Sequence, residues 1–294
     1  MNILTPFEYF RPETMDEALE LLATKENAKI LAGGTDLVVQ LKEKMIHPAN
    51  VIDITRIPEL KEFKVEDGKG AVFGAATTDA FCEFSEELKA KFPAFAYAAG
   101  EIGGPNVRAM GTIGGNLANS GPSAETPGSL ICYRAQLVLA SKKGERTIPV
   151  EDFITGNRRN CLEPGEMIKS IILPEPDANT YVKYNYVGMR SSMEIDIANM
   201  CMRVELDGDT IKDAMCVMGS VAIKPLISEK VPAILKGTKI GDEEVIKKAG
   251  EAAASEVHPI TDVRASADYR VDVIAALARK NLREIAEEYK SRNK

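Results

Sequence analysis

The sequence is poor in residues that bind metals. Its two histidines, His47 and His258, form no cluster. No Cys-x-x-Cys pair occurs, although zinc and iron–sulphur sites need closely spaced ligands. We therefore predict free, mostly buried thiols and no metal site within this chain. The five cysteines are Cys82, Cys132, Cys161, Cys201 and Cys216.

Long apolar runs and an excess of basic charge are also missing. No stretch approaches the roughly 18–20 apolar residues that a membrane-spanning helix needs. The first residues, Met1 to Pro6, lack the basic and apolar regions of a signal peptide. Acidic residues number 44 and basic residues 37, which gives a net charge of −7. Nucleic acids and anionic membranes are therefore not expected as partners, and a cytoplasmic location is expected.

The common nucleotide and hydrolase motifs are absent. No Gly-x-Gly-x-x-Gly follows the first expected strand, which disfavours a Rossmann domain for NAD. The P-loop, Gly-x-Ser-x-Gly and His-Glu-x-x-His motifs do not occur either. Any nucleotide site must therefore use other turns.

The patterns that are present predict a mixed fold of helices and strands. Thr14 and Glu17 form a capping box, and strands near 30–32 and 51–54 flank a helix whose apolar face extends to Met45, which makes a small βαβ unit. The proline-rich segment 174–177 is the expected domain boundary. Further strands are expected at 72–75, 135–140, 146–150, 168–173, 181–187, 197–206 and 211–219. The C-terminal helices are expected at 243–255 and 267–289, where they would cover an antiparallel sheet.

The first candidate binding segment is the turn Ala32-Gly33-Gly34-Thr35-Asp36-Leu37. A buried strand enters two glycines, which permit close approach and positive φ, and a helix begins directly afterwards. The free N–H groups and the dipole of a helix N-terminus favour an anion, so this turn is a candidate pyrophosphate cradle. Asp36 is a candidate cap. An ordinary strand–helix turn is the alternative.

The second candidate is Gly111-Thr112-Ile113-Gly114-Gly115-Asn116, which lies in a glycine-dense segment from 100 to 121. Glycines cost conformational entropy, and a purely structural loop offers little to offset it. The interleaved Thr, Asn and Ser side chains suit phosphate oxygens and sugar-like hydroxyls. A compact structural loop is the alternative.

Segments in the same order along nearly the whole chain resemble one family, the FAD-binding medium subunits of the xanthine dehydrogenase and carbon monoxide dehydrogenase group of molybdenum hydroxylases. Besides the two turns, the segments that carry the resemblance are Phe7 to Pro12, Val107-Arg108, Pro122, Pro127, Asp152 to Gly156, Leu162 to Glu166, Gly188-Met189-Arg190, Asp196-Ile197-Ala198, Gly219, Lys224-Pro225 and Asp262 to Arg270. Arg190 and Asp196 could equally form a structural ion pair.

The resemblance implies an α+β chain with a vanillyl-alcohol-oxidase-like (PCMH-type) FAD-binding fold. Two α/β subdomains, at 1–57 and 58–176, would grip an extended FAD. A C-terminal domain at 177–294, with a three-stranded antiparallel sheet and helices, would close over it.

The resemblance also implies the cofactor-binding residues. Both turns would hold the pyrophosphate and ribityl groups, largely through backbone N–H groups. Glu125 stands where relatives carry aspartate for sugar hydroxyls, and Tyr186 stands nearest to a lysine position of the family. The full set is Ile30, Leu31, Ala32, Gly33, Gly34, Thr35, Asp36, Leu37, Ala76, Ile102, Gly103, Val107, Gly111, Thr112, Ile113, Gly114, Gly115, Asn116, Ser120, Ser123, Glu125, Ile168 and Tyr186.

The implied function is electron transfer by FAD. Iron–sulphur [2Fe-2S] clusters on a small subunit, reduced by a molybdopterin-binding large subunit, would deliver electrons to the flavin, which would pass them to NAD(P) or another acceptor. The substrate of the complex would be an aromatic N-heterocycle such as nicotinate or a purine. A free-standing flavin oxidoreductase and a module that retains the fold without FAD are the alternatives.

Overall fold

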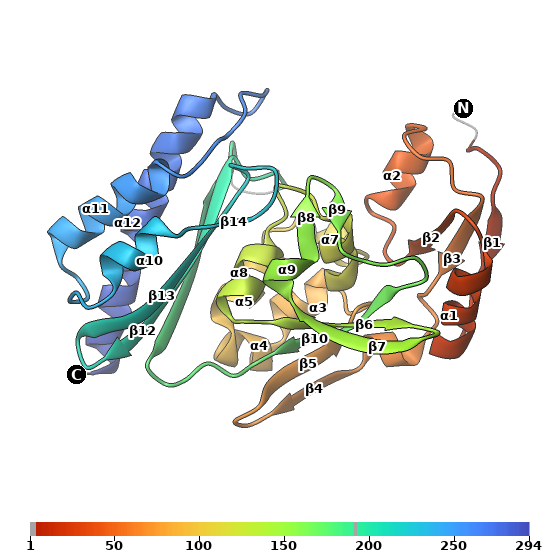
Figure 1. Cartoon of the computed structure of the whole chain (residues 1–294), viewed down its shortest axis with the longest axis horizontal. Coiled ribbons are helices and arrows are strands. Elements are labelled where there is room, and N and C mark those ends of the chain that lie inside the picture. The colour runs from red at the N-terminus through yellow and green to blue at the C-terminus, as the bar shows by residue number, and fades with distance from the viewer. Residues whose placement is uncertain (1–3, 191–192, 294) are drawn as a thin grey trace.

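The structure, a computed structural model, describes residues 4–190 and 193–293. Three larger sheets follow one another across the molecule, with the N-terminal sheet at one end and the C-terminal sheet at the other (Figure 1). In the part of the chain that is described, no helix is both long enough and apolar enough to cross a bilayer.

The N-terminal sheet is parallel, with strand order β1-β3-β2. Its elements are β1 (Glu8–Phe10), α1 (Met15–Thr24), β2 (Ala28–Leu31), α2 (Leu37–Lys42) and β3 (Asn50–Asp53). The hydroxyl of Thr14 accepts a hydrogen bond from the Glu17 N–H, which confirms the predicted cap of α1.

The βαβ unit is confirmed by β2, α2 and β3, but α2 is shorter than the sequence indicates. It ends at Lys42, and Lys44 adopts a left-handed conformation with φ 56°. A left-handed residue breaks the helical path, so Met45 leaves the apolar face and its side chain is exposed. The predicted place of Met45 on that face is therefore wrong.

The middle sheet is antiparallel, with strand order β4-β5-β10-β6-β7. Its strands are β4 (Phe63–Glu66), β5 (Gly70–Gly74), β6 (Gln136–Ser141), β7 (Gly144–Pro149) and β10 (Met167–Leu173). The predicted hairpin is confirmed by β6 and β7. The short strand β4, preceded by the 3-10 turn η1 (Pro58–Lys61), has no counterpart among the predicted strands.

Short helices surround this sheet and carry the glycine-dense segment. They are α3 (Asp79–Phe84), α4 (Glu86–Lys91), α5 (Pro93–Gly100), α6 (Pro105–Arg108), α7 (Ile113–Asn119), α8 (Thr126–Cys132) and α9 (Val150–Phe153). A two-stranded hairpin, β8 (Ile154–Gly156) with β9 (Arg159–Asn160), follows α9 and lies beside α7.

The C-terminal sheet contains the three predicted antiparallel strands and a short fourth one. Its strands are β11 (Thr180–Val187), β12 (Ala198–Asp207), β13 (Thr210–Gly219) and β14 (Leu226–Ile227), and its helices are α10 (Lys230–Leu235), α11 (Glu243–Ala254) and α12 (Ala267–Arg292). Helices α5 and α8 contact one side of the sheet, whereas α10 and α12 contact the other (Figure 1).

Strand β12 shows why this sheet joins two cores. Successive side chains of a strand point to opposite faces. Met200 and Met202 accordingly pack with α11 and α12, whereas Cys201, between them, packs in the core that the N-terminal and middle sheets share. The C-terminal sheet is therefore buried on both faces. It fixes the position of the C-terminal helices against the middle subdomain, by which we mean the middle sheet and the short helices around it.

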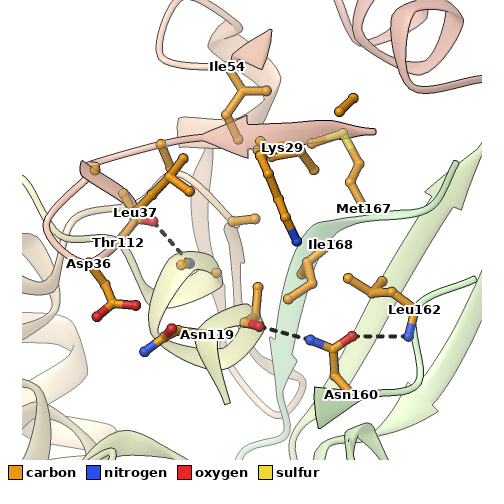
Figure 2. A pocket seen from close by; sticks show the side chains of 18 of the residues that line it. Lys29, Asp36, Leu37, Ile54, Thr112, Asn119, Asn160, Leu162, Met167 and Ile168 are labelled. Atoms are coloured by element: carbon orange, nitrogen blue, oxygen red, sulfur yellow. Dashed lines mark hydrogen bonds between the residues drawn. The ribbon is translucent and has the colours of Figure 1, made fainter. Parts of the chain in front are cut away.

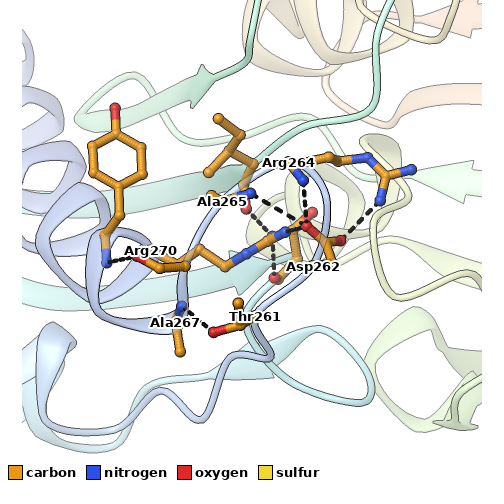
Figure 3. A network of polar contacts seen from close by, with 10 residues as sticks. Thr261, Asp262, Arg264, Ala265, Ala267 and Arg270 are labelled. Carbon is orange, nitrogen blue, oxygen red and sulfur yellow. Dashed lines mark hydrogen bonds and ion pairs between the residues drawn. The ribbon is translucent and has the colours of Figure 1, made fainter.

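A buried arginine connects α12 to the loops at one end of this sheet. Arg270 donates hydrogen bonds to the carbonyl oxygens of Ile197 and Ser220 and pairs with Asp262 at 2.7 Å (Figure 3). The Ser220 N–H in turn donates to the carbonyl of Pro122 in the middle subdomain, at 2.9 Å. Burial acts to raise the pKa of Asp262, but hydrogen bonds from Arg264 and Arg270 outweigh it and hold this pKa at about 2.

We expect Arg270→Ala to lower the free energy of unfolding by about 3 kcal/mol, because it leaves two carbonyls without their buried donor and removes one of the two guanidinium partners of the half-buried Asp262 carboxylate. Arg264→Ala is the matched control. Arg264 pairs with the same carboxylate at 2.8 Å but is more exposed, so its loss should cost about 1 kcal/mol or less. Urea denaturation measures both values, and equal losses would contradict a special role for Arg270.

Candidate cofactor site

A cavity of about 930 Å³ opens between the N-terminal sheet and the middle subdomain. Most of its lining comes from three segments, 22–40, 102–119 and 158–168, which lie far apart in the sequence (Figure 2). This volume lies in the range of small-molecule and cofactor pockets.

The fold brings most of the predicted cofactor-binding residues to this cavity. Those that line it are Ile30, Ala32, Gly33, Gly34, Thr35, Asp36, Leu37, Ile102, Val107, Gly111, Thr112, Gly114, Gly115, Asn116 and Ile168. The predicted residues outside its lining are Leu31, Ala76, Gly103, Ile113, Ser120, Ser123, Glu125 and Tyr186. Ile113 and Ser120 are fully buried.

The first glycine turn presents free backbone donors to the cavity. Across the described residues, the N–H groups of residues 33–37 form no hydrogen bond within the protein. Successive free N–H groups at the start of a helix form a concave site for an anion. This geometry fits a phosphate group and supports the predicted cradle over an ordinary strand–helix turn.

Gly33 allows the two turns to touch. A Cβ atom at Gly33 would lie 1.8 Å from the carbonyl oxygen of Met110 and 2.9 Å from the Cα of Gly111. Any side chain at this position would force the two walls apart. Gly34 has φ +71°, a left-handed conformation that glycine adopts without strain.

The second turn uses its backbone donors internally. At the start of α7, the N–H groups of Ile113 and Gly114 donate to the carbonyls of Thr77 and Ala75, at 3.1 and 3.0 Å. The Gly115 N–H donates to the Thr112 hydroxyl at 3.1 Å (Figure 2). The expectation that these amides are free for a diphosphate is therefore wrong. The turn still lines the cavity, through its glycines and through Thr112 and Asn116.

Asp36 does not cap α2, contrary to the prediction, because its side chain makes no capping bond. Its Oδ2 atom instead accepts hydrogen bonds from Gln40 at 2.5 Å and from Arg158 at 2.8 Å. The negative charge that this turn adds near an anion is thus paired with a guanidinium.

The far end of the cavity contains residues that the sequence patterns did not single out. Lys29 extends from β2 toward Ile168 (Figure 2). The Asn160 amide donates to the Ala118 carbonyl at 2.8 Å and accepts from the Leu162 N–H at 3.2 Å. Asn160 comes from the β8–β9 hairpin, and no local sequence signal places that hairpin beside α7.

A second group of predicted residues lies where the middle subdomain meets the C-terminal sheet. Burial raises the pKa of Glu125 well above its usual range, and the charge of Asp196 adds to this. Burial also raises the pKa of Asp196 to about 7. The Asp196 carboxylate accepts hydrogen bonds from Tyr184 and Asn199, both at 2.9 Å. These hydrogen bonds do not test the alternative of an Arg190–Asp196 ion pair, which stays a prediction.

Tyr186 belongs to an aromatic cluster at the same junction. Its ring lies 6.4 Å from the rings of both Tyr97 and Tyr184. Burial raises the pKa of Tyr186, and the nearby carboxylate of Glu101 adds to this. Because Ile102, which follows Glu101, lines the cavity, the aromatic cluster lies close to one of its ends.

Comparison with known proteins agrees with this architecture. The family described as "FAD binding domain in molybdopterin dehydrogenase" matches residues 5–176, and the "CO dehydrogenase flavoprotein C-terminal domain" matches residues 183–285. The chain thus has the domain arrangement of a flavoprotein subunit, with an FAD-binding domain followed by a flavoprotein C-terminal domain.

Three relatives illustrate the similarity. The glyceraldehyde dehydrogenase medium chain of Sulfolobus acidocaldarius is 31% identical over 95% of this chain and 98% of its own. The nicotinate dehydrogenase FAD-subunit of Eubacterium barkeri is 34% identical over 68% of this chain and 69% of its own. A solved structure of carbon monoxide dehydrogenase from Hydrogenophaga pseudoflava superimposes with a TM-score of 0.91 at 31% identity, covering 98% of this chain and 99% of that chain. This chain belongs to the FAD-binding medium subunits of the molybdenum hydroxylase family.

Asp79, at the wall of the cavity, provides a pH-dependent test of the site. Its carboxyl packs against Gly111, where a Cβ would lie 2.4 Å from Oδ2, and Oδ1 has no hydrogen-bond partner among the described residues. Burial raises the pKa of Asp79 to about 7. Such a group favours folding at low pH, and this contribution is lost as the pH rises from the unfolded value of about 3.9 toward 7.

We therefore expect Asp79→Asn to become more stable relative to the wild-type chain by on the order of 3 kcal/mol between pH 4 and pH 7. The measurement is urea denaturation of the FAD-free chain at several pH values. The other buried carboxyls occur in both proteins, and Asp79 is only a minor influence on the pKa of Glu125. Most of the difference between the two profiles therefore reports on Asp79. Parallel profiles would show that its carboxyl ionises normally.

Proposed function

We propose that this chain holds FAD in the cavity as an electron relay, with the diphosphate on the free N–H groups of residues 33–37. The observation that carries the proposal is this row of free donors in a cavity of cofactor size. Backbone donors bind phosphate oxygens without a basic side chain. The Thr112 to Asn116 segment would form the opposite wall and hold the groups next to the diphosphate.

We further propose the direction in which the cofactor extends. The aromatic cluster of Tyr97, Tyr184 and Tyr186, with the buried carboxyls of Glu125 and Asp196, lies beyond Ile102 and suits a planar ring with polar edges. The end near Lys29, Leu162 and Ile168 would then accommodate the adenosine. When bound, FAD supplies the redox chemistry, and the protein contributes orientation and electrostatics.

In this proposal, the chain itself does not convert an organic substrate. Electrons would come from [2Fe-2S] clusters of a small subunit, reduced in turn by a molybdopterin-binding large subunit, and would leave to NAD(P) or another acceptor. The relatives named as medium chains or FAD-subunits support such a heteromeric assembly. We also propose an aromatic N-heterocycle such as nicotinate or a purine as the substrate of the complex, supported by the nicotinate dehydrogenase relative.

The assembly is tested by purifying the tagged chain from its native host. We expect two further subunits to copurify and the flavin absorbance to bleach when the substrate of the complex is added without an acceptor. Reoxidation by NAD or NADP then identifies the acceptor. A chain that purifies alone and is reduced directly by a small substrate would support a free-standing oxidoreductase instead.

The cofactor site is tested with two matched glycine variants. Gly34→Glu places a carboxylate next to the proposed diphosphate, so we expect at least about a tenfold loss in FAD affinity from charge repulsion alone. Gly68→Glu is the control: Gly68 has a similar φ of +76°, but a Cβ there meets no atom within 4 Å and it lies outside the cavity. Quenching of FAD fluorescence measures both affinities. Equal affinities would place the diphosphate elsewhere.

Gly114→Asp is a poorer test, although Gly114 lines the cavity. A Cβ at Gly114 would lie 2.5 Å from the carbonyl oxygen of Ala75. That substitution would disturb the docking of α7 against β5, so a loss of FAD would report on folding and not on the cofactor.

A further inference from the structure

Arg158 connects the two walls of the cavity. It lies between β8 and β9, and its N–H donates to the carbonyl of Ser120 at 3.0 Å. Its Nη1 atom donates to Asn119 Oδ1 and to Asp36 Oδ2, both at 2.8 Å. One guanidinium therefore joins the end of α7 to the first glycine turn, at the cavity that it helps to line.

The backbone at Arg158, in the turn between β8 and β9, is left-handed. Its φ is +53°, a left-handed conformation that residues with a Cβ rarely adopt. Strained residues persist where the surrounding contacts fix them, and they often occur at binding sites. Here the contacts are the hydrogen bonds to Ser120 and Asn119, which hold the guanidinium in place over Asp36.

Asp36 creates an electrostatic conflict that Arg158 resolves. The Asp36 N–H is one of the free donors of the turn, whereas its carboxylate carries a negative charge within the same turn. Two phosphate groups at this turn would be repelled by an unpaired carboxylate. The ion pair with Arg158 neutralises that charge while the backbone donors remain free.

We propose that Arg158 is a positioning residue for the FAD diphosphate, acting by neutralising Asp36 and by joining the two walls of the cavity. The inference rests on the proposed function, because it presupposes a diphosphate at residues 33–37. Two effects can be separated: the charge effect depends on Asp36 being ionised, whereas the bridging effect requires both side chains.

A double-mutant cycle measures the charge effect directly. Affinity for FAD is determined by fluorescence quenching for the wild-type chain, Arg158→Gln, Asp36→Asn and the double variant. We expect Arg158→Gln to weaken binding roughly tenfold, since it exposes the diphosphate to an unpaired carboxylate. Asp36→Asn removes the charge but keeps an amide oxygen that can accept from Arg158, so it should bind at least as well as the wild type. The double variant should recover most of the affinity lost in Arg158→Gln.

Ionic strength gives a second readout. The loss in Arg158→Gln should shrink in 1 M salt, because salt screens the repulsion from Asp36. Arg158→Lys keeps the charge and should bind FAD within a few-fold of the wild type. Arg159→Gln is the matched control, since Arg159 is the next residue, is exposed and lies outside the cavity. It should leave the affinity unchanged.

The outcomes separate this inference from the proposed function. If the wild-type chain binds no FAD, the proposed function fails, and this inference fails with it. If the wild-type chain binds FAD but Arg158→Gln binds it equally well, or Asp36→Asn weakens binding as much as Arg158→Gln with no recovery in the double variant, only the role of Arg158 is overturned. Should Arg158→Gln not fold, as judged by circular dichroism, the affinities of Asp36→Asn and Arg158→Lys decide. The inference holds if Asp36→Asn binds FAD at least as well as the wild type and Arg158→Lys binds it within a few-fold. It is overturned if Asp36→Asn binds FAD more weakly.

Discussion

The backbone contact between Gly33 and the carbonyl of Met110 sets the width of the cofactor cavity. Gly33 follows a strand of the N-terminal sheet and Met110 precedes α7, and their backbones approach so closely that a single Cβ would lie 1.8 Å from a carbonyl oxygen. Protein interiors transmit such steric overlaps because they are close-packed. The first turn can therefore face α7 only while position 33 has no side chain.

The two glycine turns have different physical roles, although their compositions are similar. In the first, the glycines leave five consecutive N–H groups without a partner among residues 4–190 and 193–293, at the edge of a cavity. In the second, Gly114 permits α7 to dock its first N–H groups onto the backbone after β5. One turn thus supplies hydrogen-bond donors, and the other supplies a wall whose position is fixed by its own donors. A rigid wall opposite a set of free donors is a preorganised arrangement for an extended anion, since little has to be ordered upon binding.

The sequence predicted the elements that have strong local signals. The cap at Thr14, the hairpin of β6 and β7 and the long helix α12 all follow from patterns within a few residues. It also identified the first turn, because a strand, two glycines and a helix are adjacent in the chain. The hydrogen bonds made by the N–H groups of the second turn could not be predicted, because their acceptors at Thr77 and Ala75 lie about 35 to 40 residues upstream. Strands of two to four residues, such as β9 and β14, are too short to show a period.

Arg158 was missed for the same physical reason. A hairpin that is distant in sequence brings it to Asp36, 122 residues away. Local composition around Arg158, with a second arginine beside it, gives no indication which of the two faces the cavity. Only the tertiary hydrogen bonds to Ser120 and Asn119 decide this.

The charge balance of the whole chain gives little guidance to the site. The chain has a net charge of −7, and an acidic protein would be expected to repel a dianionic cofactor at long range. Salt screens such long-range repulsion beyond roughly 8–10 Å, so that the groups in contact with the anion dominate its binding. At that range the cavity offers backbone N–H groups at residues 33–37 and a carboxylate already paired with a guanidinium. Neutral donors bind an anion without leaving an excess of positive charge when the site is empty, which suits a cavity whose other wall contains the buried carboxyl of Asp79.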